Sequence, residues 1–207
     1  MPYLIKTLHN KYMIVLASNS WLRKTIMDKS GLAYTSEDAN IDERSLEKKH
    51  NNVSHEKLSL LLASTKAISV AKKHPNSLTV AADTFAVLPN GERLHKPNNH
   101  EQAINLCMKQ SGKKMCVITG LAMFYKDTLL TNISKTYVEY INFSRAEIVQ
   151  LLKSDNSSIR NAALGFFLDA PGFTLVSTFS GSYTGAMGLP METLRLNIKK
   201  LGYKESL

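Results

Sequence analysis

Apolar residues in this chain fall into short runs separated by turn-forming residues, a pattern typical of β-strands. The longest run, 78–88, is apolar or β-branched except for Asp83, and Pro89-Asn90-Gly91 supplies a turn directly after it. We therefore expect a buried central strand at 78–88. The other segments expected to form strands are 12–17, 34–40, 115–125, 129–143 and 173–179.

Capping residues and helix-ending glycines predict helices between these strands. Ser18-Asn19-Ser20 precedes a helix from Trp21 to Lys29, and Gly31 lies where a left-handed residue ends a helix. The remaining helices are expected at 54–73, 99–110, 144–152 and 190–201, with a loop at 181–185 before the last one. Interleaved strands and helices predict an α/β domain with a mixed sheet.

The composition is that of an ordinary soluble protein, with 207 residues of which 43% are hydrophobic and 21% charged. No apolar run is long enough to cross a bilayer, and the segment from Met1 to Asn10 lacks the apolar core of a secretory signal. Cys107 and Cys116 fall in a predicted helix and a predicted strand, without zinc-site spacing. We expect a cytoplasmic protein with both thiols reduced.

The net charge of +9 favours an anionic ligand, either a nucleic acid or a nucleotide phosphate. A strand, a polar turn and a helix N-terminus at 12–23 would form a natural anion site, with Arg23 in the first helical turn. The alternatives are a solvated basic surface and a capped helix with exposed basic residues, both of which are common.

Asp83 is the main candidate for catalysis. A carboxylate inside an apolar strand is costly unless it is paired, hydrogen-bonded or bound to a metal. The alternative is a strand that ends early and leaves Asp83 at a solvated rim. Lys66 lies one turn after Leu62 in the helix predicted at 54–73, and we expect it at the edge of the apolar face.

Eight short motifs occur along the chain in a specific order. They are Leu16-Ala-Ser-Asn-Ser20 with Arg23, Ile41-Asp-Glu43, Leu62-Ala-Ser-Thr-Lys-Ala67, Ala82-Asp-Thr84, Lys96-Pro97, Ser111-Gly112, Thr119-Gly120 and Gly188-Leu-Pro190. Together they resemble the Maf family of nucleoside triphosphate pyrophosphatases. The resemblance covers nearly the whole chain and implies a single domain at 12–203 after an N-terminal extension at 1–11.

The resemblance implies an ITPase-like α/β fold, in which helices flank an elongated mixed sheet and a cleft separates two lobes. The implied activity is hydrolysis of a nucleoside triphosphate to the monophosphate and pyrophosphate, with Mg²⁺ or Mn²⁺ as the metal. A homodimer is an expectation from the family alone. Neither a membrane nor a nucleic acid is an expected partner.

The motifs also imply roles for particular residues. By position, Asp83 matches the proton acceptor, and Glu43 matches a second acid that holds the metal together with Asp83. The positions that match phosphate-binding groups are Ser18, Arg23, Lys66 and Lys96. These residue types suit the reaction. Cationic side chains and a helix N-terminus bind a triphosphate, and Mg²⁺ prefers carboxylates and water as ligands.

The positions that set base choice in the family fall at Leu22, Thr84 and Asp169. Arg, Thr and Gln there resemble the branch that acts on dTTP and UTP, whereas Trp, Gln and Glu resemble the branch that acts on 7-methyl-GTP. Asp169, when ionised, would accept hydrogen bonds from N–H groups of a base, or it lies in an exposed turn. Trp21 stands where the family usually has proline. We expect a pyrimidine or modified nucleoside triphosphate as substrate.

The alternative is a catalytically weakened member of the same fold that binds nucleotides or nucleic acid. The charge of +9 and the poor match to the family at 161–172 favour it. No RNP-like, KH-like or helix-turn-helix signature supports it, and aromatic residues make up only 8% of the chain.

Overall fold

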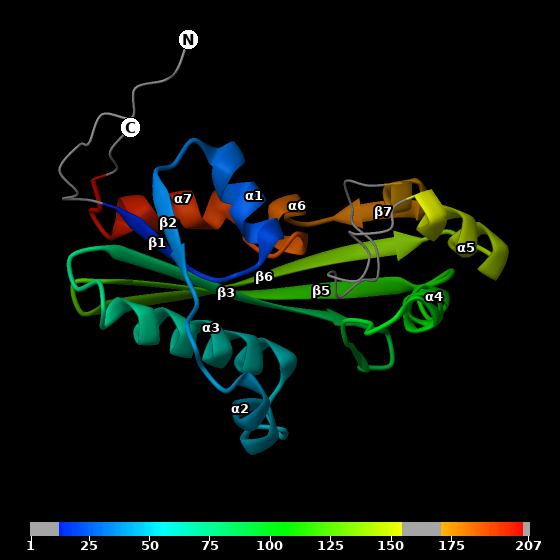
Figure 1. Ribbon diagram of the computed structural model, residues 1–207, viewed down its shortest axis with the longest axis horizontal. Coiled ribbons are helices and arrows are strands. Elements are labelled where there is room, and N and C mark those ends of the chain that lie inside the picture. The colour runs from blue at the N-terminus through cyan, green and yellow to red at the C-terminus, as the bar shows by residue number, and fades with distance from the viewer. Residues whose placement is uncertain (1–12, 155–170, 205–207) are drawn as a thin grey trace, which may run out of the picture.

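A seven-stranded mixed sheet runs along the long axis of the computed structural model, which describes residues 13–154 and 171–204 (Figure 1). The strands are β1 (Ile14–Ala17), β2 (Tyr34–Glu37), β3 (Leu78–Val87), β4 (Arg93–Leu94), β5 (Lys114–Tyr125), β6 (Thr128–Tyr140) and β7 (Val176–Ser180). Their order is β2-β1-β3-β5-β6-β7, and β4 pairs with β3. Strands β1, β2 and β3 are parallel, whereas the other pairs are antiparallel.

Helices cover both faces of this sheet and its far end (Figure 1). On one face lies α3 (His55–Ala71), with α2 (Glu43–Lys49) below it, and on the other lie α1 (Trp21–Ser30), α6 (Tyr183–Ala186) and α7 (Met191–Lys200). Near the far ends of β5 and β6 lie α4 (His100–Met108) and α5 (Arg145–Ser154). The expected mixed α/β fold is confirmed. None of the described helices has the length and apolar character needed to cross a membrane.

Buried side chains form separate clusters along the sheet. One cluster lies at the β1 end and includes Leu16, Leu78 and Leu194, and another lies at the α4 end and includes Ile104 and Ile148. Burial of apolar side chains in such clusters is the main favourable contribution to folding. Two lobes built on one sheet are the arrangement that the resemblance implies.

Local capping signals placed most of the helix boundaries correctly. The side chain of Asn99 accepts a hydrogen bond from the Gln102 N–H at 2.8 Å, and Gly31 adopts a left-handed conformation with φ of 73°. Ser144 and Glu147 form the predicted capping box, in which the Ser144 N–H donates to the Glu147 carboxylate at 2.7 Å. These contacts depend only on neighbouring residues, so the sequence predicts them well.

Three elements differ from the prediction. The strand expected at 173–179 is a 3-10 helix at Pro171–Leu175 followed by β7, and the loop expected at 181–185 contains the short helix α6. Helix α2, which was not predicted, has no buried residue and therefore lacks an apolar stripe. Its start is fixed by Asp42, whose carboxylate accepts a hydrogen bond from the Ser45 N–H at 3.0 Å.

Gly120 brings α3 into close contact with the sheet. A Cβ atom at this position would lie 2.6 Å from the backbone carbon of Ser59 and 2.8 Å from the Leu60 nitrogen. Only glycine allows this approach, and Gly120 is also the residue of β5 that pairs with Asp83. The same contact that packs α3 on the sheet therefore places α3 near Asp83.

Candidate active site

A cavity of about 590 Å³ opens at the point where β1 ends and its parallel neighbour β3 continues. The β1–β3 pairing stops at Leu16 and Val80, whereas β3 runs on to Val87, so the turn after β1 lies beside Asp83. Crevices at the carboxyl ends of parallel strands are the usual ligand sites of open α/β sheets. The topology therefore places the cavity before any side chain is considered.

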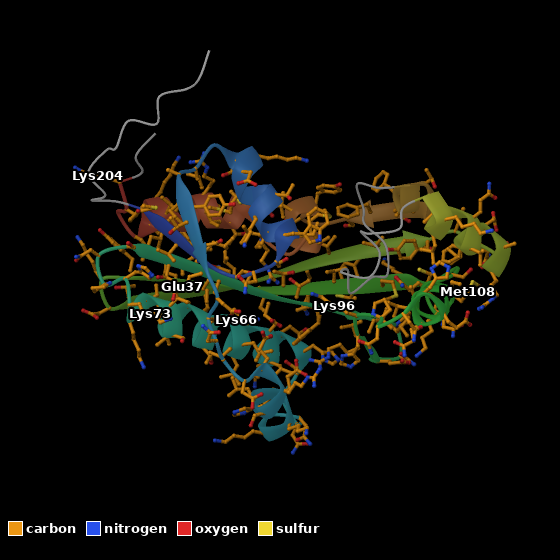
Figure 2. All side chains as sticks on the ribbon, in the orientation of Figure 1. Glu37, Lys66, Lys73, Lys96, Met108 and Lys204 are labelled. Carbon is orange, nitrogen blue, oxygen red and sulfur yellow. The ribbon has the colours of Figure 1, made fainter. Side chains whose placement is uncertain are left out.

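Eight of the nine residues predicted for the site line this one cavity. They are Ser18, Leu22, Arg23, Glu43, Lys66, Asp83, Thr84 and Lys96. The ninth, Asp169, lies outside the described residues. Figure 2 labels Lys66 and Lys96, which come from α3 and from the segment after β4 and lie in the middle of the molecule.

Lys66 joins the two predicted acids. Its ammonium nitrogen lies 2.6 Å from Oδ1 of Asp83 and 2.8 Å from Oε2 of Glu43. Asp83 is 6% exposed and Lys66 is 7% exposed. Asp83 is thus the paired carboxylate inside a continuous strand, and the alternative of a solvated rim is wrong. Lys66 is buried rather than placed at the edge of the apolar face, because the carboxylates on the sheet and on α2 offset the cost of burying its charge.

Arg23 is fixed by three hydrogen bonds. Its Nε donates to the Gly188 carbonyl at 2.8 Å, Nη1 to the Ser18 hydroxyl at 3.2 Å, and Nη2 to the Thr84 hydroxyl at 3.2 Å. Burial lowers the pKa of Arg23 from its ordinary value, whereas the nearby charges of Asp83 and Glu43 act in the opposite direction. The guanidinium is therefore held in one orientation in the cavity wall, as bidentate binding of an oxyanion requires.

The turn between β1 and α1 offers backbone donors to an anion. The Ser18 hydroxyl accepts a hydrogen bond from the Ser20 N–H at 3.1 Å, whereas the Ser20 side chain makes no capping hydrogen bond to α1. The positive end of the α1 dipole is therefore not neutralised by a capping hydroxyl at this position. A phosphate would be stabilised here.

Lys96 lies in the segment after β4, at the rim of the cavity, and the residue is exposed to solvent. Partial burial of its ammonium group lowers its pKa, and repulsion from Arg23 lowers it further, while Glu43 partly compensates. Lys96 therefore lacks a fully compensating negative charge in the cavity. An anionic ligand would supply that charge.

The sequence did not single out a second ion pair at the cavity wall. Arg93 Nη2 lies 2.5 Å from Glu47 Oε2, and the guanidinium carbon lies 4.4 Å from the centre of the Phe85 ring. Glu47 follows Glu43 by one helical turn, so α2 is tied to the cavity by two carboxylates on one face. In the sequence, the four-residue spacing of Glu43 and Glu47 was the signal that could have placed both acids on one face of a helix.

Thr119 supports Thr84 from the neighbouring strand. The hydroxyls of the two residues lie 3.0 Å apart, and the Thr119 hydroxyl donates to the Gly185 carbonyl at 2.8 Å. Thr119 and Gly188 lay within recognised motifs, but the sequence assigned them no role. In the structure they hold Thr84 and Arg23 in place.

The carboxylates present suit a hard divalent cation that also binds phosphate. In the described part of the chain no three His, Cys, Asp or Glu residues gather into a closed metal cage. Mg²⁺ is usually held by one or two carboxylates together with substrate phosphates and water. Asp83 and Glu43, which share Lys66 as a partner, fit that requirement.

Comparison with known proteins shows similarity across nearly the whole chain. Residues 13–201 match the sequence model of the family described as Maf-like protein. A dTTP/UTP pyrophosphatase of Pyrococcus abyssi is 34% identical over 93% of this chain and 97% of its own length. A dTTP/UTP pyrophosphatase of Fusobacterium nucleatum is 31% identical, covering 94% and 98%. A nucleoside triphosphate pyrophosphatase of Corynebacterium glutamicum is 27% identical, covering 93% and 96%.

Proposed function

Because the chain belongs to the family of Maf-like proteins, we propose that it hydrolyses a nucleoside triphosphate to the monophosphate and pyrophosphate. The observation that carries the proposal is the buried pair of Lys66 and Asp83, 2.6 Å apart, in a cavity that Arg23 also lines. A buried acid beside fixed cations provides both a proton acceptor and charge stabilisation for phosphoryl chemistry.

Arg23, Lys66 and Lys96 would bind the triphosphate together with the N-terminus of α1. Arg23 presents a fork of N–H groups, which suits the non-bridging oxygens of a phosphate. Lys66 and Lys96 act as point charges, and Ser18 contributes a hydroxyl at the β1–α1 turn. As the reaction proceeds, the same cations stabilise the negative charge that develops on the departing pyrophosphate.

Asp83 is proposed as the base. A water oxygen attacks the α-phosphorus, the bond from that phosphorus to the bridging oxygen breaks, and pyrophosphate leaves with the electron pair. The proton of the water passes to Asp83 and then to solvent. Lys66 binds Oδ1, which holds the carboxylate in one orientation before the step.

Glu43 and Asp83 would hold Mg²⁺ or Mn²⁺. Such an ion, when bound, neutralises phosphate charge and lowers the pKa of water. Glu43 is proposed to orient the ion rather than to accept the proton, because it lies on α2 with its side chain about half exposed, at 46%.

The measurement that tests the proposal is the identity of the products. Ion chromatography of a reaction with UTP and Mg²⁺ should show pyrophosphate and UMP in equal amounts. Orthophosphate and UDP would contradict the proposal, because attack would then occur at the γ-phosphorus.

A pyrimidine nucleoside triphosphate, or a modified nucleotide, is the proposed substrate. Two of the relatives described above are named for dTTP and UTP, and Thr84 resembles that branch. Asp169 is proposed to accept an N–H of the base. Asp169→Asn should then change the ratio of kcat/KM between bases and leave the metal requirement unchanged. A uniform change on every nucleotide would contradict the role of Asp169.

A cytoplasmic location is proposed from the reduced state expected of Cys107 and Cys116, and a homodimer is proposed from the family resemblance alone. Light scattering on the purified protein measures the oligomeric state. A monomer at micromolar concentration would contradict the dimer without affecting the proposed reaction.

A further inference from the structure

The single tryptophan of the chain lines the candidate active site. Trp21 is the first residue of α1, and it lines the same cavity as Ser18 and Arg23. Its surface is 42% exposed. The tryptophan therefore occupies the cavity wall beside the phosphate-binding turn while a large part of its surface remains open to solvent.

The other aromatic rings that line the described part of the cavity are less suited to contact a ligand. Phe85 is 6% exposed, and the guanidinium of Arg93 covers its ring at 4.4 Å from the ring centre. His95 has a smaller ring and follows β4. Trp21 is thus the lining residue that offers a large aromatic surface to a bound molecule.

The charges of the cavity determine which end of a nucleotide would approach the indole. The phosphates of a nucleotide would bind near Lys66, which is buried, and near Arg23, because both side chains are cationic. Burial lowers the pKa of Arg23. An apolar indole cannot compensate phosphate charge. A triphosphate seated on these two residues extends its nucleoside end away from the buried part of the cavity, and Trp21 is an exposed aromatic residue of the described lining.

We propose that the indole of Trp21 stacks on the base of the bound nucleotide and so favours nucleotides over base-free polyphosphates. This inference rests on the proposed function. Stacking between a base and an aromatic ring adds affinity and tolerates every base, because each base has a π-face. Trp21 therefore supplies affinity for the nucleoside end, a role separate from the choice among bases proposed for Asp169.

The test compares a ligand with a base and a ligand without one. Calorimetry with Mg²⁺ would measure the Kd of α,β-methylene-UTP, which resists cleavage at the proposed bond, and the Kd of inorganic tripolyphosphate. Trp21→Ala should weaken binding of the UTP analogue about tenfold and change that of tripolyphosphate less than twofold. Trp21→Phe should restore most of the loss, because phenylalanine also stacks.

Tyr137→Ala is the matched control, because Tyr137 is 41% exposed on β6 and is not among the described residues that line the cavity. It should leave both Kd values unchanged. Since the chain has one tryptophan, its fluorescence gives a second reading. The UTP analogue should quench it strongly and tripolyphosphate should not.

Equal losses for the two ligands in Trp21→Ala, no loss for either, or no binding of the analogue to the unaltered protein would overturn the stacking proposal. Failure of the proposed reaction gives a different result, namely that the unaltered protein binds the UTP analogue but releases no pyrophosphate from UTP. The two ideas can therefore fail separately.

Discussion

The ammonium nitrogen of Lys66 lies 2.6 Å from Oδ1 of Asp83, and both side chains are buried between α3 and the sheet. Loss of one member of a buried ion pair usually destabilises a protein by about 3–5 kcal/mol, because it leaves a charge without compensation. Here Glu43 lies 2.8 Å from the same nitrogen. A second carboxylate therefore remains for Lys66 when Asp83 is neutralised.

Asp83→Asn should fold and lose turnover. The amide keeps the size of the side chain but cannot accept the proton of the attacking water. We expect kcat to fall by about 10²–10⁴-fold, the usual range for a lost acid–base group. Pyrophosphate release and the melting temperature measure the two effects.

The control for this prediction is Asp127→Asn. Asp127 lies in the exposed turn between β5 and β6 with a φ of 62°, a conformation that asparagine also adopts. This variant should keep full activity. Near-normal turnover in a folded Asp83→Asn protein would exclude Asp83 as the base.

Lys96 should make nucleotide binding sensitive to alkaline pH. Its pKa lies below the ordinary value of 10.5, so it loses its positive charge at a lower pH than an exposed lysine does. As pH rises through that lowered pKa, kcat/KM should fall, because this parameter reports ionisations of the unliganded enzyme. Lys96→Arg, which stays charged, should keep kcat/KM high at pH values where the unaltered enzyme declines. Identical alkaline limbs would show that Lys96 does not bind the substrate.

Gly120→Ala should weaken both the fold and the site. The added Cβ would lie 2.6 Å from the Ser59 backbone, so α3 must move away from the sheet and carry Lys66 with it. We expect a loss of about 1–3 kcal/mol in the free energy of unfolding, the usual cost of overpacking, together with a higher KM. Urea denaturation measures the first quantity.

Thr131→Ala serves as the control for Gly120→Ala, because Thr131 is exposed on the neighbouring strand β6. It should leave both the unfolding free energy and KM nearly unchanged. Unaltered stability in Gly120→Ala would mean that α3 is not held as closely as the structure shows.

Glu56 should contribute to stability in a defined pH window. A hydrogen bond from Lys135, whose nitrogen lies 2.5 Å away, lowers the Glu56 pKa from 4.5 to about 2. The folded-state pKa lies below the unfolded value, so the stabilisation is complete above pH 4.5 and is lost as pH falls toward 2. Glu56→Gln should lower the melting temperature at pH 7, and the difference from the unaltered protein should shrink below pH 4.5. A constant difference across this range would exclude the ion pair as its cause.

Local chemistry explains which parts of the fold could be predicted. Asn99 and Gly31 act on their own helix ends, and the apolar run at 78–88 marks the buried strand whatever surrounds it. Helix α2 has neither an apolar stripe nor a buried residue, and its Glu43 and Glu47 form ion pairs with Lys66 and Arg93. Those partners lie on other elements, so the local signals for the helix were limited to the Asp42 cap and the four-residue spacing of Glu43 and Glu47.

In the candidate active site, too, the features set by neighbouring residues could be predicted and those set by distant contacts could not. Motif order brought eight residues to one cavity, but it did not indicate that Lys66 is buried between two acids. That burial depends on the close approach of α3 at Gly120, a contact between distant parts of the chain. Nothing in the sequence around Arg93 distinguishes it from an ordinary surface arginine. The pairing of β4 with β3 places it at the cavity wall.

The hydrogen bond from Arg23 to the Gly188 carbonyl joins residues 165 positions apart. During synthesis Arg23 is made long before its acceptor. A nascent or truncated product that stops before Gly188 lacks the carbonyl that orients the guanidinium. The full set of contacts that orients Arg23 therefore forms only after both segments have been synthesised and packed together, so the complete phosphate site is a late product of folding rather than a guide to its early stages.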